Sequence, residues 1–261
     1  MRERIAWIFT FTILTLIGYS QGCVHRQAVP EIEVSLPQDK LDNYNDSFEK
    51  FREELWEMIG FTWNPAQLAK LKIADASVEN GELRITTKSG GFSKGGVASK
   101  YKIRGDFDVQ VDCRIDFLGE NQDIDQLLTF AVVEKAVRGK KSRLLCISLL
   151  KKEGGKQNGI FAAYREKGKY QPGKWVKTGD FNGALRIIRT GGKVTTLYSR
   201  QGNPEWIKMD SFPSTGYDVT VAFALQNFFI ERQTIDALST ITAAFDNFRI
   251  NAASEIIEGE I

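Results

Sequence analysis

The sequence has very little histidine. The single one, His25, lies near the N-terminus, ahead of every segment with a strand pattern. Serine–histidine and cysteine–histidine catalytic sites and histidine metal sites are therefore nearly excluded from the main part of the chain. The glycine-rich stretch 90–96 lacks the Lys-Ser/Thr pair of a phosphate-binding loop. Paired carboxylates remain as the route to catalysis.

An excess of charge of either sign is also missing. The chain has 35 Lys and Arg against 33 Asp and Glu, and removal of residues 1–22 leaves 33 against 32. A nearly neutral chain of this kind is not a general nucleic-acid binder, so we expect no nucleic-acid partner. Any charged partner must be recognised by a local patch. The apolar content of 42% is that of an ordinary globular protein.

Cysteine is scarce too, with three residues in 261. Cys113 and Cys146 each lie inside an apolar run with a strand pattern. In an oxidising compartment they could pair, but free cysteine also behaves as a small buried hydrophobe. The sequence favours two buried thiols over a disulfide. No spacing resembles a zinc site, and no cofactor is expected.

The N-terminus has the pattern of a targeting signal. Arg2 and Arg4 precede an uncharged, mostly apolar run over 5–19, which is short for a membrane span. Ser20-Gln21-Gly22 then places Cys23 at a new N-terminus. This arrangement resembles a bacterial lipoprotein signal, although Ser20 stands where that family usually has leucine. It implies lipidation of Cys23 and a location in the bacterial cell envelope, lipid-anchored and either periplasmic or on the surface. A plainly secreted protein and an uncleaved anchor are the alternatives.

Residues 23–40 are interpreted as a tether, with an edge strand at 32–36 as the alternative. One short helix is predicted over Asp46–Ile59, where Asp46 or Ser47 caps a run of apolar residues at helical spacing. These apolar residues are Phe48, Phe51, Leu55 and Met58 or Ile59.

Strand patterns dominate after the helix. Asp106–Phe117 alternates over its whole length and predicts a half-buried antiparallel strand. Its apolar side consists of Phe107, Val109, Val111, Cys113, Ile115 and Phe117. Residues 181–210 predict a β-meander, because two alternating runs flank the turn at 190–193 and a third run follows Gly202-Asn203-Pro204. The other expected strands are Ala69–Ala74, Glu82–Thr87, Val97–Ile103, Leu127–Val133, Arg143–Leu150, Gly159–Arg165, Lys174–Thr178, Tyr217–Leu225 and Ala243–Ile250.

Some twelve short strands with almost no helix between them exclude a parallel βαβ architecture. The long alternating strands favour an all-β fold, a two-sheet antiparallel jelly-roll sandwich, over a closed barrel. We expect this domain to span 41–251 and to be followed by an acidic, frayed tail over 252–261.

Three groups of segments resemble the concanavalin A-like lectin/glucanase superfamily, and in particular its secreted bacterial DUF1349-like members. The resemblance covers roughly 61–250. It implies a concanavalin A-like jelly roll and a glycan or polysaccharide as partner, and its short motifs are mostly structural. The segments are Gly81–Ile85; Leu185–Arg189 with Tyr198–Gly202 and Trp206; and Phe245–Ile250.

Aromatic residues after position 160 are the candidate ligand contacts, because sugar rings stack their C–H faces on Trp and Tyr. Trp175 is the first candidate, since it stands next to a Pro-Gly turn. Tyr170 and Tyr198 are further candidates, and Lys169 and Lys174 supply charge beside Trp175. Trp206 is interpreted as packing on its own hairpin.

Clusters of Lys and Arg at 135–143 and 165–177 form a possible basic patch for an anionic glycan or a lipid headgroup, although solubilisation of hairpin tips is the commoner cause of such clusters.

Glucanases of the superfamily use a Glu-x-Asp-x-(x)-Glu strand motif. Residues 120–126 imitate it only in part, because no glutamate follows at the required place, and a solvated acidic loop is the preferred interpretation. The superfamily also implies a possible structural calcium held by Asp246, with Asp46 supplying the other side.

The sequence therefore leaves three hypotheses for the function. The first is a non-catalytic glycan-binding domain of a secreted or lipid-anchored envelope protein, and it is preferred. The second is a glycoside hydrolase acting through paired carboxylates. The third is a structural or protein-interaction lipoprotein. The first and third are not enzymes, so the sequence leans against catalysis.

Overall fold

The computed structural model describes residues 29–59, 71–90, 92–118, 125–134, 143–152, 157–166, 169–203, 205–228 and 239–258. The predicted signal peptide (1–22), the lipidation candidate Cys23 and the start of the predicted tether lie outside these residues. Within the described residues, no helix is long and apolar enough to cross a membrane.

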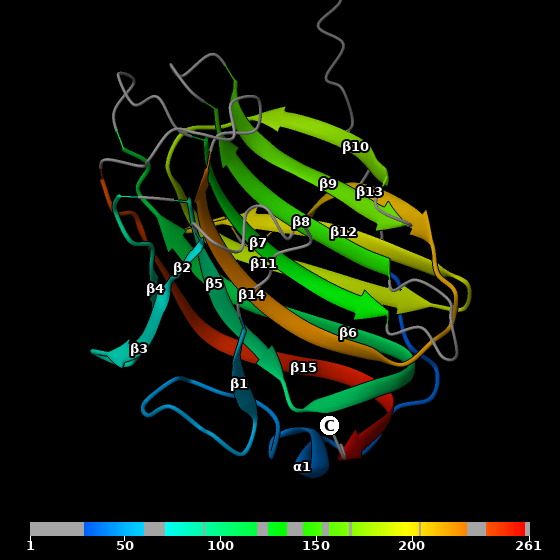
Figure 1. The fold of residues 1–261 in the computed structure, drawn as a ribbon. Helices are drawn as coiled ribbons and strands as arrows, with labels where there is room; N and C mark the ends of the chain where they lie inside the picture. Colours follow the sequence, from blue (N-terminus) through cyan, green and yellow to red (C-terminus); the bar gives the residue numbers. More distant parts are fainter. Residues whose placement is uncertain are drawn as a thin grey trace, which may run out of the picture.

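Two sheets are stacked face to face, as Figure 1 shows. Sheet 1 has the strand order β10-β9-β8-β7-β14-β5, with β1 and β2 both paired to the outer edge of β5. Its pairs are antiparallel except β2–β5, which is parallel. The strands are β1 (Trp56–Ile59), β2 (Leu71–Ile73), β5 (Phe92–Ser99), β7 (Asp125–Glu134), β8 (Arg143–Lys151), β9 (Asn158–Glu166), β10 (Lys169–Lys177) and β14 (Val219–Phe228).

Sheet 2 has the order β13-β12-β11-β6-β15-β4-β3 and is antiparallel throughout. The long strand β6 joins the two sheets, because Ile103 near its start pairs with Val219 of β14. The strands are β3 (Asp75–Glu79), β4 (Glu82–Thr86), β6 (Tyr101–Ile115), β11 (Phe181–Thr190), β12 (Lys193–Arg200), β13 (Ile207–Pro213) and β15 (Thr242–Glu258).

The main core lies between the sheets and is built by alternation along each strand. From β6, the core takes the alternating residues predicted from the sequence, Phe107 through Ile115, while Asp112 and Arg114 point to the opposite side. Sheet 1 contributes Phe130, Ile147 and other alternate residues to the same core. This arrangement confirms the predicted all-β jelly-roll sandwich. We call the side of each sheet that points away from this core its outer face.

The meander predicted over 181–210 is present as β11, β12 and β13. Thr190 pairs with Lys193 across the tight turn, where Gly191 has a positive φ of 56°. Glycine adopts this backbone conformation at no steric cost, so the turn chemistry agrees with the sequence. β11 also pairs with β6 along nine residues, which places the meander beside the longest alternating strand.

The helix predicted over Asp46–Ile59 is absent, and the prediction is wrong in position. The helix of the described chain is the four-residue α1 (Gln38–Leu41). Asp46 instead makes a β-bridge with Phe248, and its carboxylate accepts hydrogen bonds from the Phe48 amide and the Trp56 indole, each at 2.8 Å. Phe48 has a positive φ of 51°, which ends any helix there. Tertiary contacts therefore override a helical spacing.

Two strand boundaries also differ from the sequence expectation. The glycine-rich loop expected at 89–96 becomes strand from Phe92 onward, and the chain bends at Lys100, so the expected strand 97–103 is divided between β5 and β6. At the C-terminus, β15 continues to Glu258 beyond the expected end at Ile250, because it pairs with β6 as far as Tyr101. Residues 252–258 are therefore strand rather than a frayed tail.

Cys113 and Cys146 are separate buried thiols, as the sequence favoured. Burial raises the pKa of both thiols, that of Cys146 to about 11. They are packing residues rather than nucleophiles at neutral pH.

Candidate functional site

Trp175 lies on the outer face of sheet 1, on the edge strand β10. A register shift between Pro172 and Trp175 interrupts the pairing of β10 with β9 just before the tryptophan. The Trp175 ring stacks on the ring of Phe161, with centroids 5.2 Å apart and an interplanar angle of 11°. Trp175 is partly buried. Its ring is therefore fixed on the sheet while part of it remains exposed.

Gly159 explains how close the indole lies to the strand beneath it. A Cβ added to Gly159 would stand 2.5 Å from two atoms of the Trp175 ring and 2.5 Å from the Val176 carbonyl oxygen. Any side chain at this position would push the indole away. The glycine is required by this close approach, and the indole is held against the backbone of β9.

The residues beside Trp175 on this face are apolar. Alternate residues of β7, β8 and β9 form a second buried cluster here, separate from the main core, and Trp175 packs against it. Thr129 and Ser148 add a hydroxyl pair at 3.0 Å. The cluster contains Ala131, Cys146, Leu150, Phe161 and Ala163. Trp175 therefore rests on an apolar support.

The other predicted ligand residues of β10 lie on the same strand. Lys174 is exposed next to Trp175, and its backbone amide donates to the Asp210 carboxylate at 2.9 Å. Lys169 and Tyr170 belong to β10, but their side chains lie outside the described residues. Lys174 and Trp175 are thus consecutive residues of the edge strand of sheet 1.

Tyr198 is not available to a ligand. It is only 5% exposed and packs in the main core, edge-on to Phe181. We therefore remove it from the candidate ligand contacts. Trp206 packs on the Arg186 guanidinium, which lies 5.1 Å from the ring centroid on β11. That contact agrees with its interpretation as a structural residue of the meander.

The predicted calcium pair is not assembled. Asp46 is 5% exposed, and both of its carboxylate oxygens already accept hydrogen bonds from Phe48 and Trp56. Asp246 lies on β15 beside Asp112 instead. Within the described ranges, no group of three or more His, Cys, Asp or Glu is placed to hold a metal ion.

Several sequence candidates lie partly or wholly outside the described residues. These are the acidic motif as far as residue 124 and the parts of the two basic clusters at 135–142 and 167–168. The remainder of the acidic motif, Asp125 and Gln126, begins β7, and Gln126 is fully buried and accepts a hydrogen bond from the Leu118 amide.

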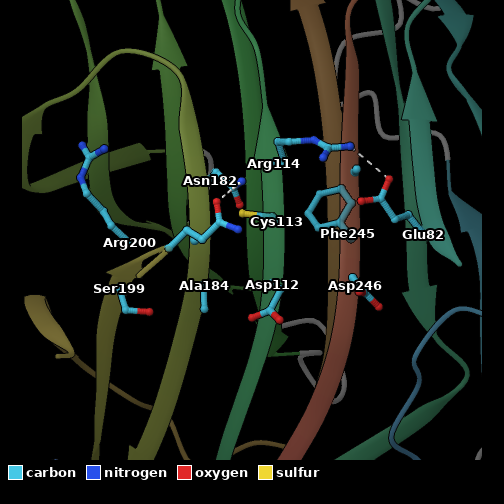
Figure 2. Close-up of a pocket in the computed structure, with 13 residues that line it drawn as sticks. Glu82, Asp112, Cys113, Arg114, Asn182, Ala184, Ser199, Arg200, Phe245 and Asp246 are labelled. Atoms are coloured by element: carbon cyan, nitrogen blue, oxygen red, sulfur yellow. Dashed lines mark hydrogen bonds and ion pairs between the residues drawn. The ribbon is translucent and has the colours of Figure 1, made fainter. Parts of the chain in front are cut away.

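A polar hollow of about 340 Å³ occupies the outer face of sheet 2 (Figure 2). The side chains around it come from five strands or their ends: β4, β6, β11, β12 and β15. The lining residues are Glu82, Asp112, Cys113, Arg114, Asn182, Gly183, Ala184, Ser199, Arg200, Gln201, Ala244, Phe245 and Asp246. The hollow therefore gathers carboxylates, guanidiniums, amides and a hydroxyl in one place.

Asp112 and Asp246 lie side by side on neighbouring strands, where they are register partners (Figure 2). Asn247 ties them together, since its side-chain amide donates to Asp112 Oδ2 at 3.2 Å and to Asp246 Oδ2 at 3.0 Å. Burial raises the pKa of both carboxyls, and the neighbouring charges of Asp112 and Glu82 raise that of Asp246 further. The strand is irregular here, with Asn247 at a positive φ of 47°.

Other polar side chains of the hollow are also paired. Arg114 crosses β15 to reach Glu82 at 3.2 Å, as Figure 2 shows, and Arg84 contacts the same Glu82 oxygen at 3.2 Å. On the other side, the Asn182 amide donates to Gln201 at 2.6 Å. These contacts hold the rim in place around the smaller residues of the floor.

Sequence reasoning missed this hollow. Alternation correctly placed Asp112 and Arg114 on the polar side of their strand, and Asp246 was singled out for a different role. The partners Asn182, Ser199 and Glu82 come from distant segments, and only the sheet register brings them together. The one signal of the hollow that the sequence carries is that small residues and charged residues fall on the same outer face.

No protein-family model matches the sequence, and no curated protein does so either. Solved structures do match. A Bacillus licheniformis β-glucanase is 15% identical over 79% of this chain and 96% of its own, with a TM-score of 0.55. A β-1,3-1,4-glucanase (lichenase) derived from a mouse hindgut metagenome is 13% identical over 80% and 98%, also at 0.55. The CBM2 module of the evolved Dit of Lactobacillus casei BL23 phage J-1 is 11% identical over 80% and 95%, at 0.55. The chain thus has the concanavalin A-like jelly-roll fold predicted for it.

Proposed function

We propose that this chain is a non-catalytic glycan-binding domain that presents Trp175 to a sugar ring. The observation that carries the proposal is the fixed indole, stacked on Phe161 and held against the strand at Gly159. A sugar ring offers a flat face of C–H groups, which stacks on an aromatic ring. An indole already held in position loses little conformational entropy when the sugar arrives.

Lys174 supplies the polar component of this site. Its side chain is exposed on the residue that precedes Trp175, at the register shift of β10, while its backbone amide is held by Asp210. An ammonium group donates hydrogen bonds to sugar hydroxyls and ring oxygens. A stacking surface with a donor beside it orients the ring without any chemistry on it.

The side chains that pack against Trp175 in the second buried cluster are apolar, which suits stacking on a sugar ring. The described cluster consists of Ala131, Cys146, Leu150, Phe161 and Ala163. The fold is shared with β-glucanases and with a CBM2 module, so it is compatible with either activity and does not decide between them.

The proposal extends to location. A lipid on Cys23 or a cleaved secretion signal would place the domain in the bacterial envelope or outside the cell. A domain there, joined to the membrane by the residues that precede Ser35, where the chain begins to hydrogen-bond to β15, would hold a polysaccharide near the cell surface. Mass spectrometry of Cys23 in a membrane fraction tests this part separately from glycan binding.

The binding test uses β-1,3-1,4-glucan oligosaccharides as the probe, because one structural neighbour is a β-1,3-1,4-glucanase. Calorimetric titration should give a measurable Kd for the native chain, and Trp175→Ala should weaken binding about tenfold or more. Trp175→Phe keeps an aromatic ring and should retain part of the affinity. Ile207→Ala, which removes a 38%-exposed apolar residue from β13, is the control and should change nothing.

Two results would overturn the proposal. One is an affinity that Trp175→Ala leaves unchanged. The other is release of reducing ends from the oligosaccharide by the purified chain, which would identify a hydrolase. Absence of binding to a wider panel of neutral and acidic glycans would direct attention to the structural or protein-interaction alternative.

A further inference from the structure

We propose that the hollow on the outer face of sheet 2 is a second ligand site, which binds the hydroxyl groups of a neutral saccharide by hydrogen bonds. It lies on the opposite sheet from Trp175 and shares no residue with that site. This inference goes beyond the proposed function, because it needs neither Trp175 nor the apolar cluster around it.

The shape of the hollow follows from the sizes of side chains in two neighbouring rows. Ser199, Ala184 and Asp112 are register partners across β12, β11 and β6, and the row continues to Asp246 on β15. Ala244 occupies the next row, opposite Arg114. Small side chains in the middle and long ones at the rim leave a depression over the sheet. Its volume of about 340 Å³ is within the range of small-ligand sites.

The lining of the hollow contains both hydrogen-bond acceptors and hydrogen-bond donors. Asp112 and Asp246 are carboxylate acceptors, Asn182 and Gln201 carry both amide donors and acceptors, and Ser199 carries a hydroxyl. A saccharide has the matching property, since every hydroxyl both donates and accepts. Carboxylates receiving hydroxyl protons form charge-assisted hydrogen bonds, which are stronger than neutral ones.

Other ligand classes fit less well. Three carboxylates, those of Glu82, Asp112 and Asp246, disfavour phosphates and other anions, because the nearby Arg114 is already paired with Glu82. The Arg200 guanidinium donates to Thr178 and lies over the Phe181 ring. A lipid would need apolar walls, whereas the side chains at the rim are polar. The described residues also offer no metal-binding group of three or more ligands.

Asn247 fixes the two acceptors before any ligand arrives. Its amide nitrogen contacts Asp112 Oδ2 and Asp246 Oδ2 at 3.2 and 3.0 Å, so these two oxygens are no farther apart than the sum of the two distances. Both carboxyls project from neighbouring strands on one side of the hollow (Figure 2). Two acceptors held this close can receive neighbouring hydroxyls of one sugar ring.

The test observes the side-chain amides of Asn182 and Gln201 by ¹H–¹⁵N nuclear magnetic resonance. The probe is a β-1,3-1,4-linked glucotetraose added to millimolar concentration. Both amide signals should shift on titration, and they should shift equally in Trp175→Ala. If the Trp175 site does not bind a sugar, the shifts of these two amides still test the hollow. If the two amides do not shift, the proposal for the Trp175 site is unaffected.

Asp112→Asn should weaken the binding reported by these two amides about tenfold, because it removes a charged acceptor. Ala184→Leu should do the same by filling the floor while leaving every charge in place. Asp75→Asn, on the exposed edge strand β3, is the matched control and should have no effect. Amide signals that do not move with the probe, or an Asp112→Asn variant that binds like Asp75→Asn, would overturn the proposal.

Discussion

The outer faces of the two sheets differ sharply although both cover the same core. That of sheet 1 carries an apolar cluster topped by the Trp175–Phe161 stack. That of sheet 2 carries carboxylates, amides and guanidiniums around a hollow. One jelly roll thus presents two chemically different surfaces, an apolar one with an aromatic stack on sheet 1 and a hydrogen-bonding one on sheet 2.

The difference between the two outer faces follows from the residue patterns of the strands. β8 is buried on both faces, with Cys146 and Ile147 in different clusters, and its sequence is nearly continuous in apolar residues. β6 alternates strictly, so Asp112 and Arg114 reach the outer face between core residues. A strand pattern thus predicts which face is polar, although not which residues meet there.

The largest expected effect is at Gly159, on the apolar outer face of sheet 1. Gly159→Ala places a methyl group within 2.5 Å of the Trp175 ring and of the Val176 carbonyl oxygen. Because one of these contacts is backbone, we expect a loss of about 3 kcal/mol in the free energy of unfolding. Glycan binding should fall together with stability. Urea unfolding and calorimetric titration measure the two effects.

Gly179→Ala is the control for this change, because nothing lies within 4 Å of a Cβ added there. It should leave both the free energy of unfolding and the affinity close to native. A Gly159→Ala variant as stable as Gly179→Ala would mean that the indole does not lie against β9 as described.

A smaller effect is expected at Lys94, a charged residue in sheet 1. Lys94 pairs with Gln226, next to Leu127 of the apolar face. Burial, and then the charge of Arg165, lower its pKa to about 8 from 10.5. A lowered lysine pKa means that the protonated form destabilises the fold, fully below the folded pKa and not at all above the unfolded value.

Lys94→Met should therefore raise the free energy of unfolding at pH 7 by about 1–3 kcal/mol. The gain should shrink between pH 8 and 10.5, as the native lysine loses its proton. Chemical unfolding at several pH values measures it. A gain that does not depend on pH would show that packing, rather than charge burial, is responsible.

The smallest effect is expected at Asp246, on the polar outer face of sheet 2. Its raised pKa means that the ionised carboxylate carries a penalty in the folded state. The penalty is absent below the unfolded pKa and complete above the folded one. Asp246→Asn should thus stabilise the chain by a few tenths of a kcal/mol at pH 7, since the site is partly solvated. The gain should vanish in acid, whereas a loss of stability at pH 7 would contradict the assignment.

Much of the fold could be predicted, because alternation over Asp106–Phe117 and the turns of 181–210 are local signals. The helix at Asp46–Ile59 could not be judged locally. Its apolar spacing suits a helix, but Phe48 and Trp56 pack in the core and Asp46 pairs with a residue two hundred positions away. The two buried cysteines were predicted correctly for the same reason as the strands, since each lies in an apolar run.

The candidate sites were less predictable than the fold. The turn beside Trp175 pointed to an accessible tryptophan, but its support on Phe161 depends on strand pairing. Tyr198 could not be separated from exposed tyrosines by local sequence, because its burial depends on the opposite sheet. The hollow rests on the meeting of Asp112 with Asp246, which the register of β6 and β15 alone determines.

The most direct test of the central claim is the contact between the Trp175 ring and a bound sugar. Isotope-edited nuclear Overhauser measurements on the native chain with β-1,3-1,4-linked glucotetraose should show cross-peaks between the Trp175 ring protons and sugar C–H protons, and Trp175→Phe identifies the signals. Cross-peaks to Trp175 are the predicted result. Bound tetrasaccharide with no cross-peak to Trp175 would contradict the account.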